Sequence, residues 1–192
     1  MRYRNTVILV GILAILAAYV WFFERGPAPE AGATPTPAPE RILSFDGTAV
    51  RTVVLTRPAD GGTTRLEYAP EEETWYVVEG EAREPADQTR VTLLVSYLSD
   101  LTPLRVLEGP LDSAATYGLE PPRAQVTVQT EGGEEWTVEI GEKVLTGAAH
   151  YARLAGEEAV YTISSYIGEN VLEFLDSPPY RPTPTPEPTA TP

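Results

Sequence analysis

The feature that most constrains this chain is an uninterrupted run of 18 uncharged residues from Thr6 to Phe23. As an α-helix, such a run spans about 27 Å, close to the thickness of the hydrocarbon core of a bilayer. Its C-terminal end carries the bulky aromatic residues Trp21 and Phe22, which suit the membrane interface. Arg2 and Arg4 precede the run, and a balanced charge pair follows it. We therefore expect a transmembrane helix whose N-terminus is cytoplasmic.

A cleaved signal peptide is the alternative interpretation of this run. It would need a shorter apolar region that ends in a small-x-small cleavage site. Trp-Phe-Phe occupies that place here, and the nearest candidate site, Ala31-Gly32-Ala33, lies too far downstream. The chain has no cysteine, so it cannot be an acylated lipoprotein. These observations predict a single-pass protein of the cell membrane with an extracytoplasmic C-terminal domain.

Composition divides the chain into four parts. Residues 1–25 are the expected cytoplasmic stub and anchor, 26–40 a Pro/Ala-rich linker, 41–176 an α+β domain and 177–192 a Thr/Pro-rich disordered tail. The linker and the tail contain almost no residue to bury, and such segments favour extended polyproline II. The tail could also carry sugars or reach through a cell wall. The 136 residues of the domain suffice for a hydrophobic core without disulfides or metal.

Charge narrows the classes of partner. The net charge is −14, and residues 41–176 carry all of that imbalance, with 24 acidic and 10 basic side chains. A surface this negative repels phosphate backbones, so we expect no nucleic-acid partner. The absence of cysteine excludes thiol catalysis and cysteine-based zinc sites. Nothing in the sequence points to a cofactor.

The domain reads as strands and tight turns followed by a helix, twice. Alternating apolar residues or turn signals predict strands at 50–57, 63–68, 75–78, 124–129, 136–140, 149–154 and 159–163. A helical stripe follows the first set at Val91, Leu94, Val95, Leu98 and Leu101, with Asp87 as its N-cap. A second helix begins at Ser164 or Ser165. The predicted fold class is α+β: antiparallel sheets with helices packed on one face, in two similar β-β-β-α halves, preceded by one transmembrane helix.

No set of residues has the pattern of a catalytic or metal site. His150 is the only histidine, and neither a serine nor an aspartate can be assigned to it. The run Glu71-Glu72-Glu73 falls at a hairpin tip and lacks the ligand spacing of a calcium loop. Gly61-Gly62 and Gly132-Gly133 are hairpin turns and not phosphate loops, because no helix follows them. We therefore predict that the protein is not an enzyme.

Aromatic residues of the predicted strands offer one candidate interaction site. Trp75, Trp136 and Tyr161, with Tyr76 and Tyr151 nearby in the pattern, could form a platform on which sugar rings stack. Aromatic residues of strands more often belong to the core. An exposed, coplanar pair among the first three would favour a glycan-binding module, whereas finding all three in the core would rule it out.

The segment Tyr117-Gly118-Leu119-Glu120-Pro121-Pro122-Arg123 joins the two halves and leads directly into a strand. Gly118 permits a tight turn, and Pro121 and Pro122 enforce an extended approach. Tyr117 and Leu119 are expected to be buried anchors. The pattern predicts a rigid elbow between the halves, which is a structural role.

The elbow is also where the chain resembles a known family. The segment from Tyr117 to Val128, the strand end Ile140-Gly141-Glu142, and the later runs Tyr151–Leu154 and Val160-Tyr161 are similar to the domain of unknown function 4340 family. The resemblance covers most of residues 41–176 and implies no catalytic residues. Some members are similar to proteins encoded beside components of ABC transporters, which implies an auxiliary role outside the cytoplasm.

Two functions follow as expectations. The first is a non-enzymatic accessory or interaction subunit of a membrane complex, such as an ABC transporter, with a membrane protein as its partner. The alternative is a surface module that binds cell-wall glycan. The anchor, the spacer and the absence of a catalytic set favour the first.

Overall fold

The computed structural model of the chain describes residues 41–107 and 113–182. The expected transmembrane helix, the linker up to Glu40 and the tail beyond Pro182 lie outside these ranges. Within the described ranges, no helix combines the length and the apolar character that crossing a membrane requires.

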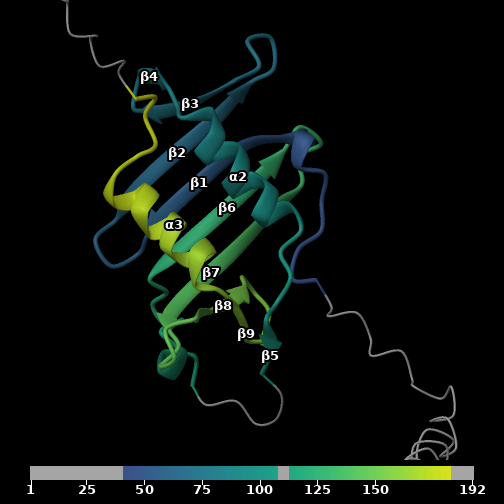
Figure 1. The fold of residues 1–192 in the computed structure, drawn as a ribbon, viewed down its shortest axis with the longest axis vertical. Coiled ribbons are helices and arrows are strands. Elements are labelled where there is room, and N and C mark those ends of the chain that lie inside the picture. Colours follow the sequence, from purple (N-terminus) through teal and green to yellow (C-terminus); the bar gives the residue numbers. More distant parts are fainter. Residues whose placement is uncertain (1–40, 108–112, 183–192) are drawn as a thin grey trace, which may run out of the picture. The chain divides into compact units, whose positions relative to one another are not determined.

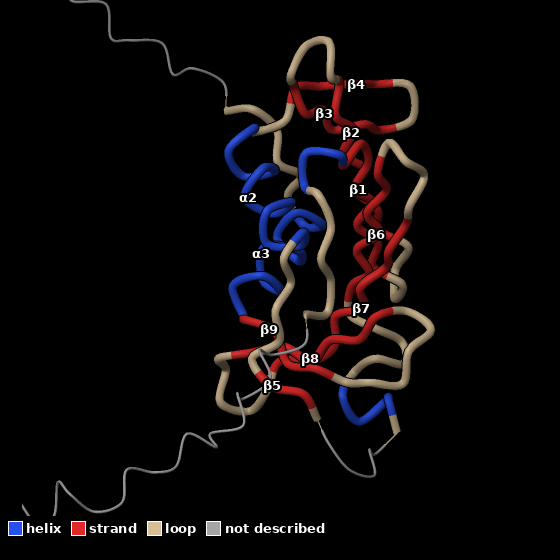
Figure 2. Tube along the Cα trace, turned by 90° about the vertical axis from the view of Figure 1, so that its right-hand side faces the viewer, coloured by secondary structure: helices blue, strands red, loops and turns tan. Residues whose placement is uncertain are grey.

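The described residues form one antiparallel sheet of nine strands with two α-helices on one of its faces (Figures 1 and 2). The strands are β1 (Val50–Arg57), β2 (Gly62–Ala69), β3 (Thr74–Glu79), β4 (Ala82–Pro85), β5 (Arg105–Val106), β6 (Ala124–Thr130), β7 (Glu135–Lys143), β8 (Ala149–Leu154) and β9 (Tyr161–Ser164). The helices are α2 (Gln88–Ser99) and α3 (Ser165–Asp176), with short 3-10 helices η1 (Gly47–Ala49) and η2 (Ala114–Tyr117). The predicted α+β class with antiparallel strands is confirmed.

The order of strands across the sheet is β4-β3-β2-β1-β6-β7-β8-β9-β5. The two halves therefore share a single sheet and do not form separate ones, because their first strands, β1 and β6, pair directly. Val53 of β1 lies opposite Val128 of β6, and Leu55 lies opposite Val126. All four side chains are fully buried. The seam between the halves is thus the centre of the hydrophobic core.

Each half contains four strands before its helix, where the sequence predicted β-β-β-α. The strand missed in the first half is β4, whose sequence Ala-Arg-Glu-Pro is exposed throughout. Such a strand has no apolar alternation to reveal it; its hydrogen bonds to β3 define it. The two-residue strand β5 was also missed. It follows α2 in the chain but pairs with β9 at the opposite edge of the sheet.

The helices cover the apolar face of the sheet. In α2, Val91, Leu94, Val95 and Leu98 are buried as predicted. The carboxylate of Asp87 accepts a hydrogen bond from the backbone N–H of Arg90 at 3.1 Å, which confirms the N-cap. In α3 the buried side chains are those of Ile167, Val171 and Phe174. Figure 2 shows both helices on the same side of the strands.

The opposite face of the sheet is polar. The hydroxyl groups of Thr127 and Thr137 lie 2.8 Å apart across β6 and β7. Two guanidinium nitrogens of Arg153 donate to one carboxylate oxygen of Glu139, at 2.8 and 2.6 Å. This alternation of apolar and polar faces explains why the period-two pattern of the sequence identified the long strands.

The segment after α3 continues along the edge of the sheet. Tyr180 forms an antiparallel bridge with Ala86, directly after β4, and the N–H of Arg181 donates to the carbonyl of Pro85 at 2.9 Å. Backbone contacts with the rest of the domain therefore continue past the expected boundary at Asp176, as far as Arg181.

The hydroxyl of Tyr180 also donates to the carboxylate of Glu79 at 2.7 Å. This hydrogen bond, with smaller effects of burial and of nearby carboxylates, raises the pKa of Tyr180 to about 12. An unfolded tyrosine has a pKa of about 10. Because folding raises the pKa, the contribution of this contact to stability is complete below pH of about 10 and is lost as the pH rises through 12.

We expect the phenolate absorbance of the full chain to show a tyrosine that ionises near pH 12 and is absent from Tyr180→Phe. The difference between the two titration curves isolates this one residue among the ten tyrosines. Titration curves of the same shape and amplitude at high pH for the two proteins would contradict the assignment of this ionisation to Tyr180.

Candidate functional site

The predicted elbow lies at the turn that leads into β6. Leu119 is 1% exposed, as expected for a buried anchor, and Pro122 is buried as well. Tyr117, the other expected anchor, is only half-buried. It ends η2, and its ring lies 5.0 Å from the ring of Tyr151 on β8. Pro121 is exposed, and the peptide bond that precedes it is cis. The elbow therefore packs against the strands of the second half.

Two glycines allow the elbow to approach β7 closely. A Cβ atom on Gly141 would lie 2.2 Å from the carbonyl oxygen of Tyr117, and one on Gly118 would lie 2.8 Å from the backbone nitrogen of Glu142. Real Cβ contacts are essentially never this short. Gly118 also has a φ of 66°, in the left-handed region that glycine adopts without steric cost. Gly141 falls within the register shift of β7 against β8. The elbow motif is thus one side of a backbone-to-backbone contact.

His150 is 1% exposed in β8, beneath α3. Its Nδ1 lies 3.2 Å from the carbonyl oxygen of Gly141, and its Nε2 has no hydrogen-bond partner among the described residues. A Cβ atom on Gly168 of α3 would lie 2.6 Å from the imidazole Cδ2. The imidazole is therefore packed tightly between β7 and α3. It contacts Gly141, the same residue of β7 that the elbow contacts.

The three aromatic residues proposed as a platform do not come together. Trp75 is on β3 and Trp136 on β7, with three strands between them, so they are separated by about 19 Å at ordinary strand spacing. Trp75 is 6% exposed, and Trp136 stacks on Phe45 with ring centroids 4.8 Å apart. Tyr161 is half-buried on β9 and packs against the core. No exposed, coplanar pair exists among these three residues.

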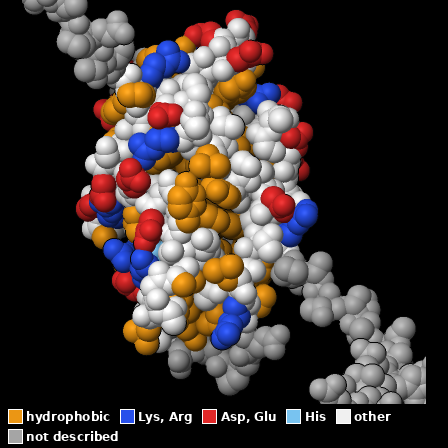
Figure 3. All heavy atoms as spheres, in the orientation of Figure 1, with side chains coloured by type: hydrophobic (Ala, Val, Ile, Leu, Met, Phe, Trp, Pro, Cys, Tyr) orange, Lys and Arg blue, Asp and Glu red, His pale blue; other side chains and the backbone are white. Residues whose placement is uncertain are grey.

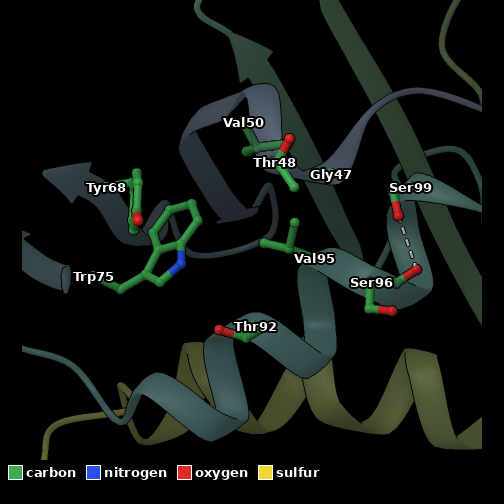
Figure 4. Close-up of a pocket in the computed structure, with 9 residues that line it drawn as sticks. All are labelled: Gly47, Thr48, Val50, Tyr68, Trp75, Thr92, Val95, Ser96 and Ser99. Atoms are coloured by element: carbon green, nitrogen blue, oxygen red, sulfur yellow. Dashed lines mark hydrogen bonds between the residues drawn. The ribbon is translucent and has the colours of Figure 1, made fainter. Parts of the chain in front are cut away.

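Trp75 instead forms one wall of a cleft of about 360 Å³ (Figure 4). The cleft lies between η1, the ends of β2 and β3, and the flank of α2. Its lining residues carry no charge: Gly47, Thr48, Val50, Tyr68, Trp75, Thr92, Val95, Ser96 and Ser99. The rings of Tyr68 and Trp75 are 5.2 Å apart, so the cleft has an aromatic end and a rim of hydroxyl groups.

Exposed apolar side chains gather over the two helices in the centre of the face shown in Figure 3. Leu93 and Tyr97 of α2 are each 39% exposed, and Tyr166 of α3 is 47% exposed. The rings of Tyr97 and Tyr166 meet edge to face at 5.5 Å. We call Leu93, Tyr97 and Tyr166 the α2–α3 surface. The sequence pattern did not reveal this surface, although Leu93 and Tyr97 have helical i, i+4 spacing beside the core stripe.

The remaining residues that the sequence raised as metal or phosphate sites lie on turns. Glu71, Glu72 and Glu73 are exposed between β2 and β3. The two Gly-Gly pairs lie at the β1–β2 and β6–β7 turns, as predicted. Over 41–107 and 113–182, no group of three or more His, Asp or Glu side chains is arranged to hold a metal ion.

This architecture defines a class: an α+β domain in which one antiparallel sheet carries both helices on one face. Residues 75–185 match the family described as Domain of unknown function (DUF4340), and the chain belongs to that family. The match begins at Trp75 and includes the elbow, whereas β1 and β2, which lie in the same sheet, precede it. No curated protein and no solved structure matches the chain.

Proposed function

We propose that the protein is a membrane-anchored accessory subunit whose domain binds a membrane-protein partner through the α2–α3 surface. The observation that carries the proposal is the exposure of this surface on helices whose opposite sides form the core. Contiguous apolar patches rimmed by polar groups typically mark interaction sites. Tyrosine is enriched at protein interfaces, because its ring supplies contact area at a low cost in conformational entropy.

Charge supports a protein partner over a lipid surface. Arg90, at one side of the α2–α3 surface, is paired with Glu173 at 2.8 Å, and the domain as a whole is strongly acidic. Anionic headgroups would be repelled by such a domain. An apolar, aromatic surface on an acidic domain suits a partner that presents an apolar groove with basic residues at its rim.

The anchor and its orientation belong to the same proposal. The run from Thr6 to Phe23 would hold the domain at the membrane, with the domain outside the cytoplasm. The glycan-binding alternative has less support, because the aromatic residues that it requires are buried or separated. It stays a prediction from the sequence.

A photo-crosslinking residue introduced at Leu93 in intact cells is expected to join the full chain to an integral membrane protein. The same residue at Gln129, exposed on the polar face of the sheet, is the matched control and should give no such product. Replacing Tyr97 and Tyr166 by serine should lower the yield at Leu93 by about tenfold or more, since interface tyrosines are commonly worth 1–2 kcal/mol each. Equal yields from Leu93 and Gln129 would contradict the proposal.

A further inference from the structure

The cleft beside Trp75 has the chemistry of a proline-recognition site. Grooves that bind polyproline II segments are lined by aromatic rings. In Figure 4 the indole nitrogen of Trp75 lies on the side of the ring that faces Thr92 and Val95. The hydrogen bonds of Trp75 among the described residues are made by its backbone, to Gln88 and Ala86. Its indole N–H therefore remains a donor for a ligand carbonyl.

The hydroxyl groups of the rim complete this arrangement. Thr48 donates its hydroxyl proton to Asp46 at 2.7 Å, which leaves its oxygen able to accept. Ser99 donates to the carbonyl of Ser96 at 3.0 Å. The neutral lining, with both donors and acceptors, matches a segment of alternating threonine and proline, whose carbonyls have no partners within a polyproline II helix.

The residues that precede a segment of this kind, Pro179 to Arg181, pair with the chain beside Trp75. The carbonyl of Pro179 accepts a hydrogen bond from the N–H of Asp87 at 2.7 Å, at the start of α2. Tyr180 bridges Ala86, and Ala86 in turn donates to the carbonyl of Trp75. Two strand spacings, about 10 Å, therefore separate the backbone of Tyr180 from that of Trp75.

Ten residues, 183–192, follow the last described position, and all but Glu187 are Thr, Pro or Ala. In polyproline II they would extend about 31 Å, which exceeds the distance to the cleft. A short tether keeps a segment at an effective concentration in the millimolar range, so even weak binding would fill the cleft.

We propose that residues 183–192 bind in the cleft between η1 and α2 of the same chain. Proline rings pack against Trp75 and Tyr68, and a carbonyl of the tail accepts from the indole N–H. The tail thereby covers Trp75 and attaches the C-terminal end of the chain to α2. This inference does not depend on the proposed function, because the α2–α3 surface lies on another side of α2.

Fluorine NMR of the full chain labelled with fluorotryptophan tests the proposal. In a Trp21→Phe background the label reports on Trp75 in the cleft and on Trp136 as an internal control. Ending the chain after Pro182 is expected to shift the Trp75 signal and leave that of Trp136 in place. A synthetic peptide of residues 182–192 should restore the original signal, with half-saturation at about millimolar concentration.

Two helix variants test whether the effect comes from the cleft. Ser96→Leu narrows the cleft and should make the Trp75 signal insensitive to removal of the tail. Thr89→Leu, exposed on α2 but not in the lining of the cleft, should respond as the unmodified chain does.

Three results would overturn the proposal. The first is a Trp75 signal that is unchanged when residues 183–192 are removed. The second is a signal that returns to its truncated position on dilution of the full chain, which would assign the tail to another copy. The third is full retention of the signal when the prolines of the tail are replaced by glycine and serine at constant length.

Discussion

Gly141→Ala is expected to lower the free energy of unfolding by about 3 kcal/mol, near the upper end for overpacked sites. The added methyl would sit 2.2 Å from the carbonyl oxygen of Tyr117, and that atom belongs to the backbone of the elbow. A backbone oxygen cannot rotate away as a side chain does. Either the elbow or β7 must therefore move, and Leu119 would lose its packing.

Chemical denaturation of the full chain, followed by circular dichroism, measures this loss. Gly132→Ala is the matched control: it lies at the β6–β7 turn, where the nearest atom to an added Cβ is 3.7 Å away. Its effect should remain within about 0.5 kcal/mol, as for ordinary surface substitutions. Similar destabilisation by the two variants would show that the contact between the elbow and β7 is not the cause.

Phe174→Ala is expected to cost about 3–5 kcal/mol, the usual range for removing a buried aromatic side chain. Phe174 is completely buried in α3 and belongs to the main core. Its backbone carbonyl accepts from the hydroxyl of Thr64 on β2 at 2.9 Å, and Arg90 of α2 lies 4.8 Å above its ring. The residue therefore joins α3 to the sheet and to α2 at once.

The same denaturation measurement applies to this variant, with Leu145→Ala as the control. Leu145 is fully exposed, so its truncation removes almost no buried surface and should change stability by no more than about 0.5 kcal/mol. Since Phe174 holds both helices, hydrogen exchange in α2 should also accelerate in Phe174→Ala. Unchanged hydrogen exchange in α2 would show that Phe174 stabilises α3 but not α2.

Local patterns predicted the elements that alternate or repeat. The strand expected at 50–57 is β1 as observed, and α2 has the expected N-cap and the expected buried stripe as far as Leu98. Leu101, the last residue of the expected stripe, is buried but lies beyond the end of the helix. Both signals arise within a few residues, because side chains alternate along a strand and recur every turn of a helix. The strand β4 has no such signal, since none of its side chains is buried.

The elbow contains one feature that the local sequence predicts and one that only the tertiary structure shows. Its turn was predicted from Gly118, whose conformational freedom is a property of the residue itself. The requirement for glycine at position 141 was not, because it comes from a carbonyl more than 20 residues earlier in the chain. Close packing between segments distant in sequence has no local signature.

The grouping of residues on the candidate surfaces also depends on the tertiary structure and not on the local sequence. Trp75, Trp136 and Tyr161 looked like one group in the sequence, but the order of strands places Trp75 at a cleft and the other two elsewhere. Tyr97 and Tyr166 are adjacent only because α2 and α3 pack on the same face of the sheet.

The sequence by itself determined the apolar run at Thr6–Phe23, the strong negative charge, the α+β class and the resemblance to a family of unknown function. All of these depend on composition or on short-range periodicity. The tertiary structure alone decided that β1 and β6 join the halves into one sheet and that the elbow rests on Gly141. It also decided that a neutral aromatic cleft lies beside α2 and that apolar side chains are exposed over α2 and α3. Those features depend on which distant segments pair, and pairing is set by burial of the whole apolar face at once.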